Sequence, residues 1–246
     1  MRTLLLSDLH SNHEAAGAVL ESARSLGFDR VVVLGDLVGY GACPNEVVAT
    51  IRDLDPFAVI RGNHDKVVAG VEPGEEFNRV AMEAARINRL LLRPENVEYL
   101  SALPRGPETI GGAFAIAHGS PLDEDEYLLD GWGAAAVFEE TDFPVCFFGH
   151  THVPGAFVLK DGAVSLLVPG KQEAVLGLDA SARYLINPGS VGQPRDCDPR
   201  ASYAIYDEAA GEVIFRRVDY PVDRARKRIR EAGLPLILEE RLQRGV

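Results

Sequence analysis

Cysteine is scarce in this chain: there are three in 246 residues, Cys43, Cys146 and Cys197, and none belongs to a CxxC pair. This spacing excludes a disulfide-rich scaffold and a zinc site built on paired thiolates. Long apolar runs are also lacking, since no stretch approaches the roughly 20 residues that a membrane-spanning helix needs. The apolar start of the chain is too short for a signal peptide. We therefore expect a cytoplasmic protein with no membrane partner.

Positive charge is in deficit as well, because 25 Lys and Arg residues stand against 37 Asp and Glu residues, for a net charge of −12. Such an acidic balance argues against a general nucleic-acid partner. One basic run, Arg224–Arg230, is expected to be a solvated helix face that pairs with acids. With 46% apolar and 25% charged residues the composition is that of a globular protein. We expect one domain over residues 1–246.

The spacing of apolar residues predicts alternating strands and helices in the first half of the chain. Strand–helix–strand repeats favour right-handed crossovers and a largely parallel sheet. The predicted strands are Thr3–Leu6, Val31–Leu34 and Phe57–Ile60, and the main predicted helices are His13–Leu26, one opened by Pro44, and Glu75–Leu92.

The second half changes to short strands joined by tight turns such as Lys160–Gly162, which is typical of antiparallel hairpins. Taken together, the two halves predict an α/β fold in which two mixed β-sheets pack together with helices outside.

Five short apolar runs end abruptly in polar residues that can bind a metal ion. In open α/β sheets, ligands bind at the carboxyl ends of the strands, so we expect these residues to converge. Five of the six histidines of the chain are among them. The residues are Asp8 and His10, then Asp36, then Asn63, His64 and Asp65, then His118, and finally His150 and His152.

The donor set consists of carboxylates, imidazoles and one amide, with no thiolate, which favours a divalent ion such as Mn, Fe, Zn, Co or Ni. It is too large for one ion, and a carboxylate can bridge two, so we expect a two-metal site. Glycine directly before Asp36, Asn63 and His150 lets the backbone turn sharply there. Each break alone is typical of an ordinary turn, whereas five in this order are not a coincidence of turns.

The series Asp8-x-His10, Gly35-Asp36, Gly62-Asn63-His64-Asp65, His118 and Gly149-His150-x-His152 resembles the calcineurin-like metallophosphoesterase superfamily. The resemblance covers about Thr3 to Pro194. Further stretches are similar to the small bacterial phosphodiesterase-like branch, namely Ser7–Asn12, His118–Pro121 and Asn187–Gly192. The resemblance implies a four-layer α/β/β/α sandwich, in agreement with the two sheets expected above.

The resemblance also implies a ligand set for two divalent ions, with Mn, Fe, Zn or Ni as candidates. Asp36 would bridge them. The first ion would be held by Asp8, His10, Asp36 and His152, and the second by Asp36, Asn63, His118 and His150. One departure is visible, because Leu37–Gly41 follows Asp36 where the larger protein-phosphatase members carry an arginine-containing continuation. This departure weakens any transfer of protein-phosphatase specificity.

Two divalent ions about 3.5–4 Å apart can lower the pKa of a shared water and clamp phosphoryl oxygens. We therefore expect an enzyme that hydrolyses a small-molecule phosphate ester, preferably a phosphodiester, by attack of a metal-activated hydroxide. His64 is left over after the ligands are assigned, and it is the candidate proton donor to the leaving group or hydrogen-bond donor to the phosphoryl oxygens. Asp65 is expected to orient His64 and fix its tautomer.

Two alternative functions stay open. The first is a phosphomonoesterase, including a protein or dinucleoside-polyphosphate phosphatase. The second is a non-catalytic scaffold with the same fold, which would have no need of His64. The native metal and the oligomeric state stay undetermined at this point.

Two residues are candidates for substrate binding. Arg195 follows a predicted strand and would present its guanidinium to a phosphate, or else pair with Asp196 or Asp198 in a surface turn. Asn12 would hydrogen-bond a metal-bound ligand, or else act as the N-cap of the helix that follows. Substrate selection is expected to fall to residues 66–108 and to the loop 121–131.

Overall fold

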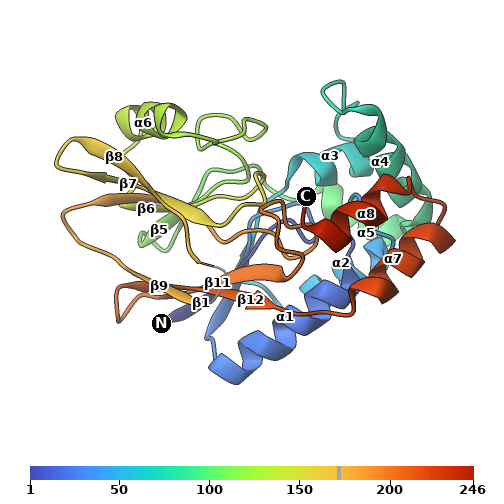
Figure 1. Ribbon diagram of the computed structural model, residues 1–246. Helices are drawn as coiled ribbons and strands as arrows, with labels where there is room; N and C mark the ends of the chain where they lie inside the picture. The colour runs from blue at the N-terminus through green and yellow to red at the C-terminus, as the bar shows by residue number, and fades with distance from the viewer. Residues whose placement is uncertain (171–172) are drawn as a thin grey trace.

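Two six-stranded mixed sheets lie face to face with helices outside them in the computed structural model, which describes residues 1–170 and 173–246 (Figure 1). In the first sheet, β3, β2 and β1 are parallel and the remaining strands continue antiparallel. Its strands, in spatial order, are β3 (Ala58–Val59), β2 (Arg30–Val33), β1 (Arg2–Leu6), β11 (Ala201–Asp207), β12 (Glu212–Val218) and β9 (Ala174–Gly177).

In the second sheet, β5, β6 and β10 run parallel to one another, and each of the other strands is antiparallel to its neighbour. The order is β4 (Glu108–Ile110), β5 (Phe114–Ile116), β6 (Val145–Phe147), β10 (Arg183–Asn187), β7 (Gly155–Lys160) and β8 (Ala163–Leu167). The predicted α/β/β/α sandwich with two mixed sheets is thereby confirmed.

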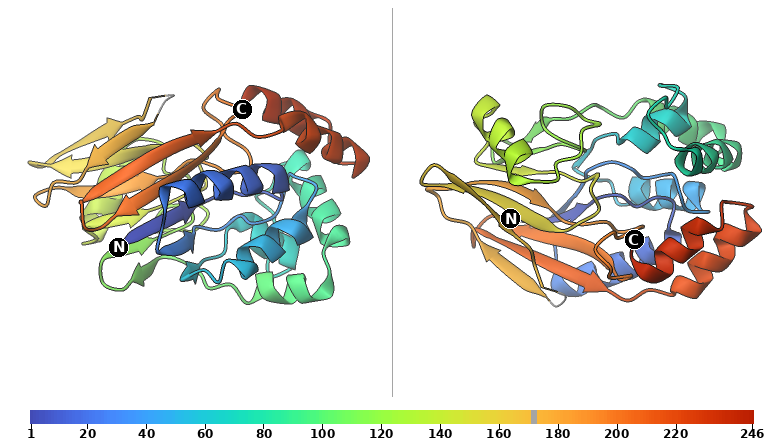
Figure 2. Two further views of the ribbon diagram at one scale, coloured as in Figure 1. Left: turned by 90° about the horizontal axis from the view of Figure 1, so that it is seen from below. Right: turned by 45° about the horizontal axis from the view of Figure 1, so that its top comes forward.

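Helix α6 (Gly131–Glu140) covers the outer face of the second sheet, and the other helices share one apolar cluster with the outer face of the first (Figure 1). Figure 2 shows α7 and α8 side by side next to α1. The helices on this side are α1 (His13–Leu26), α2 (Pro44–Asp53), α3 (Asn63–Ala69), α4 (Arg79–Leu91), α5 (Pro94–Ser101), α7 (Val222–Glu231) and α8 (Ile237–Arg244). No helix in the described ranges is both long and apolar enough to cross a membrane.

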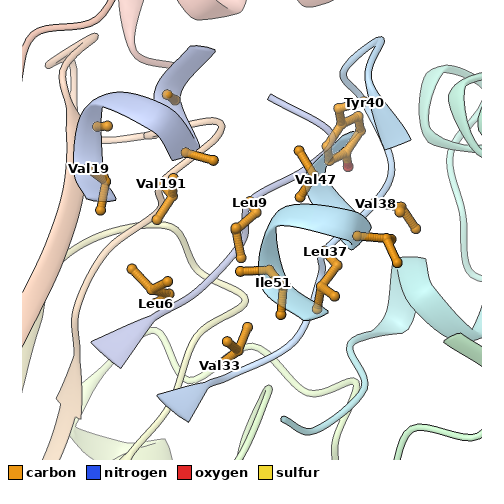
Figure 3. Close-up of a cluster of buried hydrophobic side chains, with 14 of the residues drawn as sticks. Leu6, Leu9, Val19, Val33, Leu37, Val38, Tyr40, Val47, Ile51 and Val191 are labelled. Atoms are coloured by element: carbon orange, nitrogen blue, oxygen red, sulfur yellow. The ribbon is translucent and has the colours of Figure 1, made fainter. Parts of the chain in front are cut away.

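The central strands are apolar on both faces because each face is covered by another layer. In β1, Leu5 lies between the two sheets, whereas Leu6 packs toward the helices, together with Leu9 and Ile51 (Figure 3). Val33 of β2 joins the same cluster. Complete burial of each such side chain contributes about 1.5–3 kcal/mol, so these layers hold the strand ends in fixed positions.

The helix predicted over Glu75–Leu92 begins later than expected, at Arg79. The side chain of Asn78 accepts hydrogen bonds from the backbone N–H groups of Val80 and Ala81 and so acts as the N-cap. The residues from Glu75 to Phe77 therefore belong to the loop before α4. Helices α3 and α6 and strands β4 and β9 were not predicted, and of these α3 and β4 are short, with seven and three residues.

The basic run of α7 is a face that pairs with acids, as predicted. Arg228 Nε lies 2.6 Å from the Glu14 carboxylate, and Arg224 Nε lies 3.2 Å from it. Arg230 pairs with Glu239 of α8. These pairs neutralise part of the positive charge of α7.

Candidate metal centre

The predicted metal ligands meet at the carboxyl ends of strands from both sheets. Strands β1, β2 and β3 supply residues from the first sheet, and β5 and β6 supply residues from the second. All but one of the seven side chains are buried, and Asn63 is half-buried. Their donor atoms form two groups, each within 4.8 Å: Asp8, His10, Asp36 and His152, and Asp36, His118 and His150.

Two imidazoles of the first group face each other without a proton between them. Nδ1 of His10 donates to the Val38 carbonyl at 3.0 Å, and Nδ1 of His152 donates to the Gln193 carbonyl at 2.5 Å. Because burial lowers the pKa of both histidines well below the usual value, each is neutral and each Nε2 carries a lone pair. The two Nε2 atoms lie only 3.1 Å apart. A cation between them would turn this repulsion into coordination.

Asp36 lies between the two groups. Its Oδ2 is 3.4 Å from Nε2 of His10 and 3.4 Å from Nε2 of His118. Its Oδ1 accepts a hydrogen bond from the backbone N–H of His64 at 2.8 Å. Oδ2 is buried and has no hydrogen-bond partner among the described residues, and such an atom is costly unless a ligand binds it. This is the position that a bridging carboxylate would occupy.

The second group has the same construction. Nδ1 of His118 lies 2.8 Å from the Leu34 carbonyl, and its Nε2 lies 3.3 Å from Oδ1 of Asn63. Nε2 of His150 lies 3.1 Å from the carbonyl of Asp125, which leaves Nδ1 for the centre. These backbone contacts fix the imidazole orientations as they do in metal sites. The nitrogen and oxygen donors of the two groups therefore fit divalent metal ions.

Without a metal, the charges of the buried acidic and basic groups partly neutralise one another. Burial disfavours charge on both Asp36 and His118, but their mutual attraction outweighs it: the pKa of Asp36 falls well below its usual value and that of His118 rises to about 10. Burial raises the pKa of Asp8 to about 6 and lowers that of His150 to about 3. The site thus holds more carboxylate oxygens and imidazole lone pairs than the single protonated imidazole, that of His118, can compensate.

The backbone carrying these side chains is strained. A positive φ is uncommon for residues other than glycine and costs about 1–3 kcal/mol, so it persists only where the surroundings enforce it. Here Ser7 Oγ donates to Asp8 Oδ2 at 2.7 Å, and Ser190 Oγ donates to the Asp8 carbonyl at 2.8 Å. A positive φ is found in five of the seven predicted ligands: Asp8 (54°), His10 (44°), Asp36 (53°), His150 (64°) and His152 (61°).

The expected contact between Asp65 and His64 is wrong. The Asp65 carboxylate accepts hydrogen bonds from the backbone N–H groups of Gly62 at 3.0 Å and Val38 at 3.2 Å. Nδ1 of His64 is buried with no hydrogen-bond partner among the described residues. Both residues belong to α3, and neighbours in a helix point in directions about 100° apart. Asp65 therefore holds the β2 and β3 loops together instead of orienting His64.

Asn12 is the N-cap of α1 and not a substrate ligand. Its Oδ1 accepts a hydrogen bond from the Ala15 N–H at 3.1 Å, and its Nδ2 donates to the Gly192 carbonyl at 2.9 Å. The side chain is 2% exposed. Both ends of the amide are thus used by backbone, so the alternative of a contact to a metal-bound ligand is withdrawn.

Arg195 does not hold a surface turn with its acidic neighbours. Asp196 pairs with Arg217 instead, and Asp198 pairs with Arg200 at 2.6 Å. The Arg195 guanidinium donates to Gln193 Oε1 at 3.2 Å and lies 5.7 Å from the centre of the Tyr40 ring. Its positive charge contributes to lowering the pKa values of four histidines of the site: His10, His64, His150 and His152.

Sequence reasoning did not single out two aromatic residues that lie beside the centre in the segments 66–108 and 121–131. The Tyr127 ring stacks on His150 with centroids 3.8 Å apart, and the Phe77 ring lies 4.5 Å from His64. Both belong to segments that were expected to select the substrate. No local motif marks them, because their place in the site depends on where distant loops meet.

Comparisons with known proteins agree with this geometry. The family model of the calcineurin-like phosphoesterase superfamily domain matches residues 1–211. The chain therefore belongs to the calcineurin-like phosphoesterase superfamily, and this membership indicates a metal-binding hydrolase of phosphate esters.

Individual relatives match the chain over nearly its whole length. A solved metallophosphoesterase from Sphaerobacter thermophilus is 42% identical and superposes with a TM-score of 0.88, over 100% of this chain and 99% of that one. An uncharacterized protein of Methanocaldococcus jannaschii is 40% identical over 245 residues, which is 98% of this chain and 97% of the relative. A hypothetical protein from Pyrococcus horikoshii shares the fold, with a TM-score of 0.80 and 22% identity over 100% and 98% of the two chains.

Proposed function

We propose that this chain is a phosphodiesterase that uses two divalent ions, with residues 1–246 acting as one domain. The observation that carries the proposal is Asp36 Oδ2, a buried oxygen without a hydrogen-bond partner among the described residues, equally distant from His10 and His118. Two bound ions would supply an activated water and neutralise charge on the phosphoryl oxygens.

The ligand roles follow from the two groups of donors. We assign Asp8, His10 and His152 to one ion and Asn63, His118 and His150 to the other, and Asp36 to both. The protein holds the imidazoles through backbone carbonyls, so the donors are preorganised before an ion binds.

Two residues are proposed to act on the substrate directly. Arg195 binds a phosphoryl oxygen through its guanidinium, which suits phosphate geometry. His64 donates a proton to the leaving alkoxide. Burial lowers its pKa to about 4, so the imidazole is neutral at pH 7 in the substrate-free site. Proton donation requires the imidazolium form, which the negative charge of a bound phosphoryl group would favour.

Metal-dependent hydrolysis tests the proposed function directly. Metal-stripped protein is titrated with Mn, Ni, Zn and Fe, and a chromogenic phosphodiester and phosphomonoester are compared side by side. We expect activity to appear only with metal, and kcat/KM to be at least about tenfold higher for the diester, a difference of about 1.4 kcal/mol. A monoester preference would favour the phosphomonoesterase, and inactivity with every metal would favour the scaffold.

His64→Ala tests the proton donor. A positioned acid contributes about 10²–10⁴-fold in rate when the leaving group is a poor one. We expect a loss in this range for an alkyl diester, whose alkoxide needs a proton, and a much smaller loss for a p-nitrophenyl ester. Metal content is measured in parallel as the control. Equal losses for both esters would show that His64 stabilises the phosphoryl group instead.

A further inference from the structure

A cavity of about 530 Å³ opens beside the candidate metal centre. It is lined by Asn63, His64 and His150 of the site and, beyond them, by Tyr40, residues 66–67, 72–78 and 81, Asp125 and Tyr127. His64 is 3% exposed, and its Nδ1 has no hydrogen-bond partner in the described part of the chain. A substrate whose phosphate lies at the metal centre would extend one of its arms into this cavity.

The charged groups of the cavity wall are mainly acidic. Four carboxylates stand against one ammonium group, that of Lys66, and they belong to Glu72, Glu75, Glu76 and Asp125. The Lys66 ammonium lies 2.8 Å from Glu72 and 2.5 Å from Asp125, so its charge is already neutralised. Glu75 and Glu76 are exposed, and neither has an ion-pair partner within residues 1–170 and 173–246. Their negative charges are therefore free to act on a ligand.

Aromatic rings complete the wall. Tyr40, Phe77 and Tyr127 line the cavity, and Tyr127 is 46% exposed although one ring face stacks on His150. The face of an aromatic ring attracts cations, and groups of such rings are a recurrent means of binding quaternary ammonium ions. Rings and uncompensated carboxylates on one wall thus favour a positively charged ligand.

We infer that this cavity binds the cationic arm of a zwitterionic phosphodiester, whose alcohol carries a quaternary or protonated amine. The inference rests on the proposed function, because the phosphate of the same molecule would lie at the metal centre. The acidic wall would also repel substrates with additional anionic groups, and so it selects against a polyphosphate chain. A neutral nucleoside arm would stack on Tyr127 but gain nothing from Glu75 and Glu76.

Two esters of equal shape test the charge requirement. p-Nitrophenyl phosphocholine is compared with p-nitrophenyl 3,3-dimethylbutyl phosphate, in which carbon replaces the charged nitrogen and the leaving group is the same. We expect KM to be at least about tenfold lower for the choline ester, as cation–π and carboxylate contacts together allow. The double variant Glu75→Gln/Glu76→Gln should lose this preference. Glu139→Gln, an exposed acid of α6 outside the cavity, should retain it.

Binding without turnover separates this inference from the proposed function. Choline and 3,3-dimethylbutanol are compared as ligands of the protein by saturation-transfer NMR, which needs no hydrolysis. Selective binding of choline that disappears in the double variant would support the cavity even if no ester were hydrolysed. Equal binding of the two alcohols, or a choline preference that survives in the double variant, would overturn it. A lower KM for the p-nitrophenyl ester of thymidine 5′-phosphate, unchanged in the double variant, would assign the cavity to a nucleoside.

Discussion

Asp36→Asn is expected to lower kcat/KM by about a thousandfold, or about 4 kcal/mol of transition-state stabilisation, and to reduce the bound metal. The amide has almost the same shape as the carboxylate but no charge. Its Nδ2 would either face Nε2 of His10 and His118 as a donor or turn toward the His64 N–H, which needs an acceptor. Neither orientation provides an anionic oxygen to both groups of ligands.

Metal content per chain, measured by elemental analysis after exhaustive dialysis, is the deciding readout for Asp36→Asn. Asp142→Asn is the matched control, because Asp142 is an exposed acid outside both groups of donors. The melting temperature of both variants shows whether either has lost its fold. An Asp36→Asn protein that retains the metal content of the parent would contradict the bridging role.

The metal donors could be predicted from sequence because each follows directly from a strand end. Once Leu4–Leu6 and Val31–Val33 are read as buried strands, Asp8 and Asp36 must lie at the same edge of the sheet. The glycines that precede Asp36 and Asn63 strengthen this reading, since they mark sharp turns. No long-range information is needed for these positions beyond the parallel order of the strands.

The cavity and the role of Asp65 could not be predicted in the same way. Phe77 and Tyr127 are 50 positions apart in the chain, and only the folded structure brings their loops to one cavity. For Asp65, adjacency in sequence suggested contact with His64, whereas the unrecognised helix α3 directs the two side chains apart. Short helices without a long apolar period escape recognition, and with them the direction of every side chain they carry.

Gly62→Ala is expected to destabilise the protein by about 3 kcal/mol and to abolish tight metal binding. A Cβ atom at this position would lie 2.2 Å from Oδ1 and 2.5 Å from the backbone nitrogen of Asp36. The φ of Gly62 is −103°, so the effect would come from this collision and not from backbone conformation. Relief requires the loops after β2 and β3 to separate, which moves Asp36 away from His118 and Asn63.

The measurement for Gly62→Ala is the melting temperature with and without metal, and about 3 kcal/mol corresponds to a decrease of about 10 °C for a domain of this size. Gly17→Ala is the control, because a Cβ at this exposed position of α1 would meet nothing within 4 Å. Alanine favours a helix over glycine by about 1 kcal/mol, so this variant should be slightly more stable. If Gly62→Ala instead kept the parent melting temperature and its increase on metal addition, the loops of Asp36 and Asn63 would not be in contact.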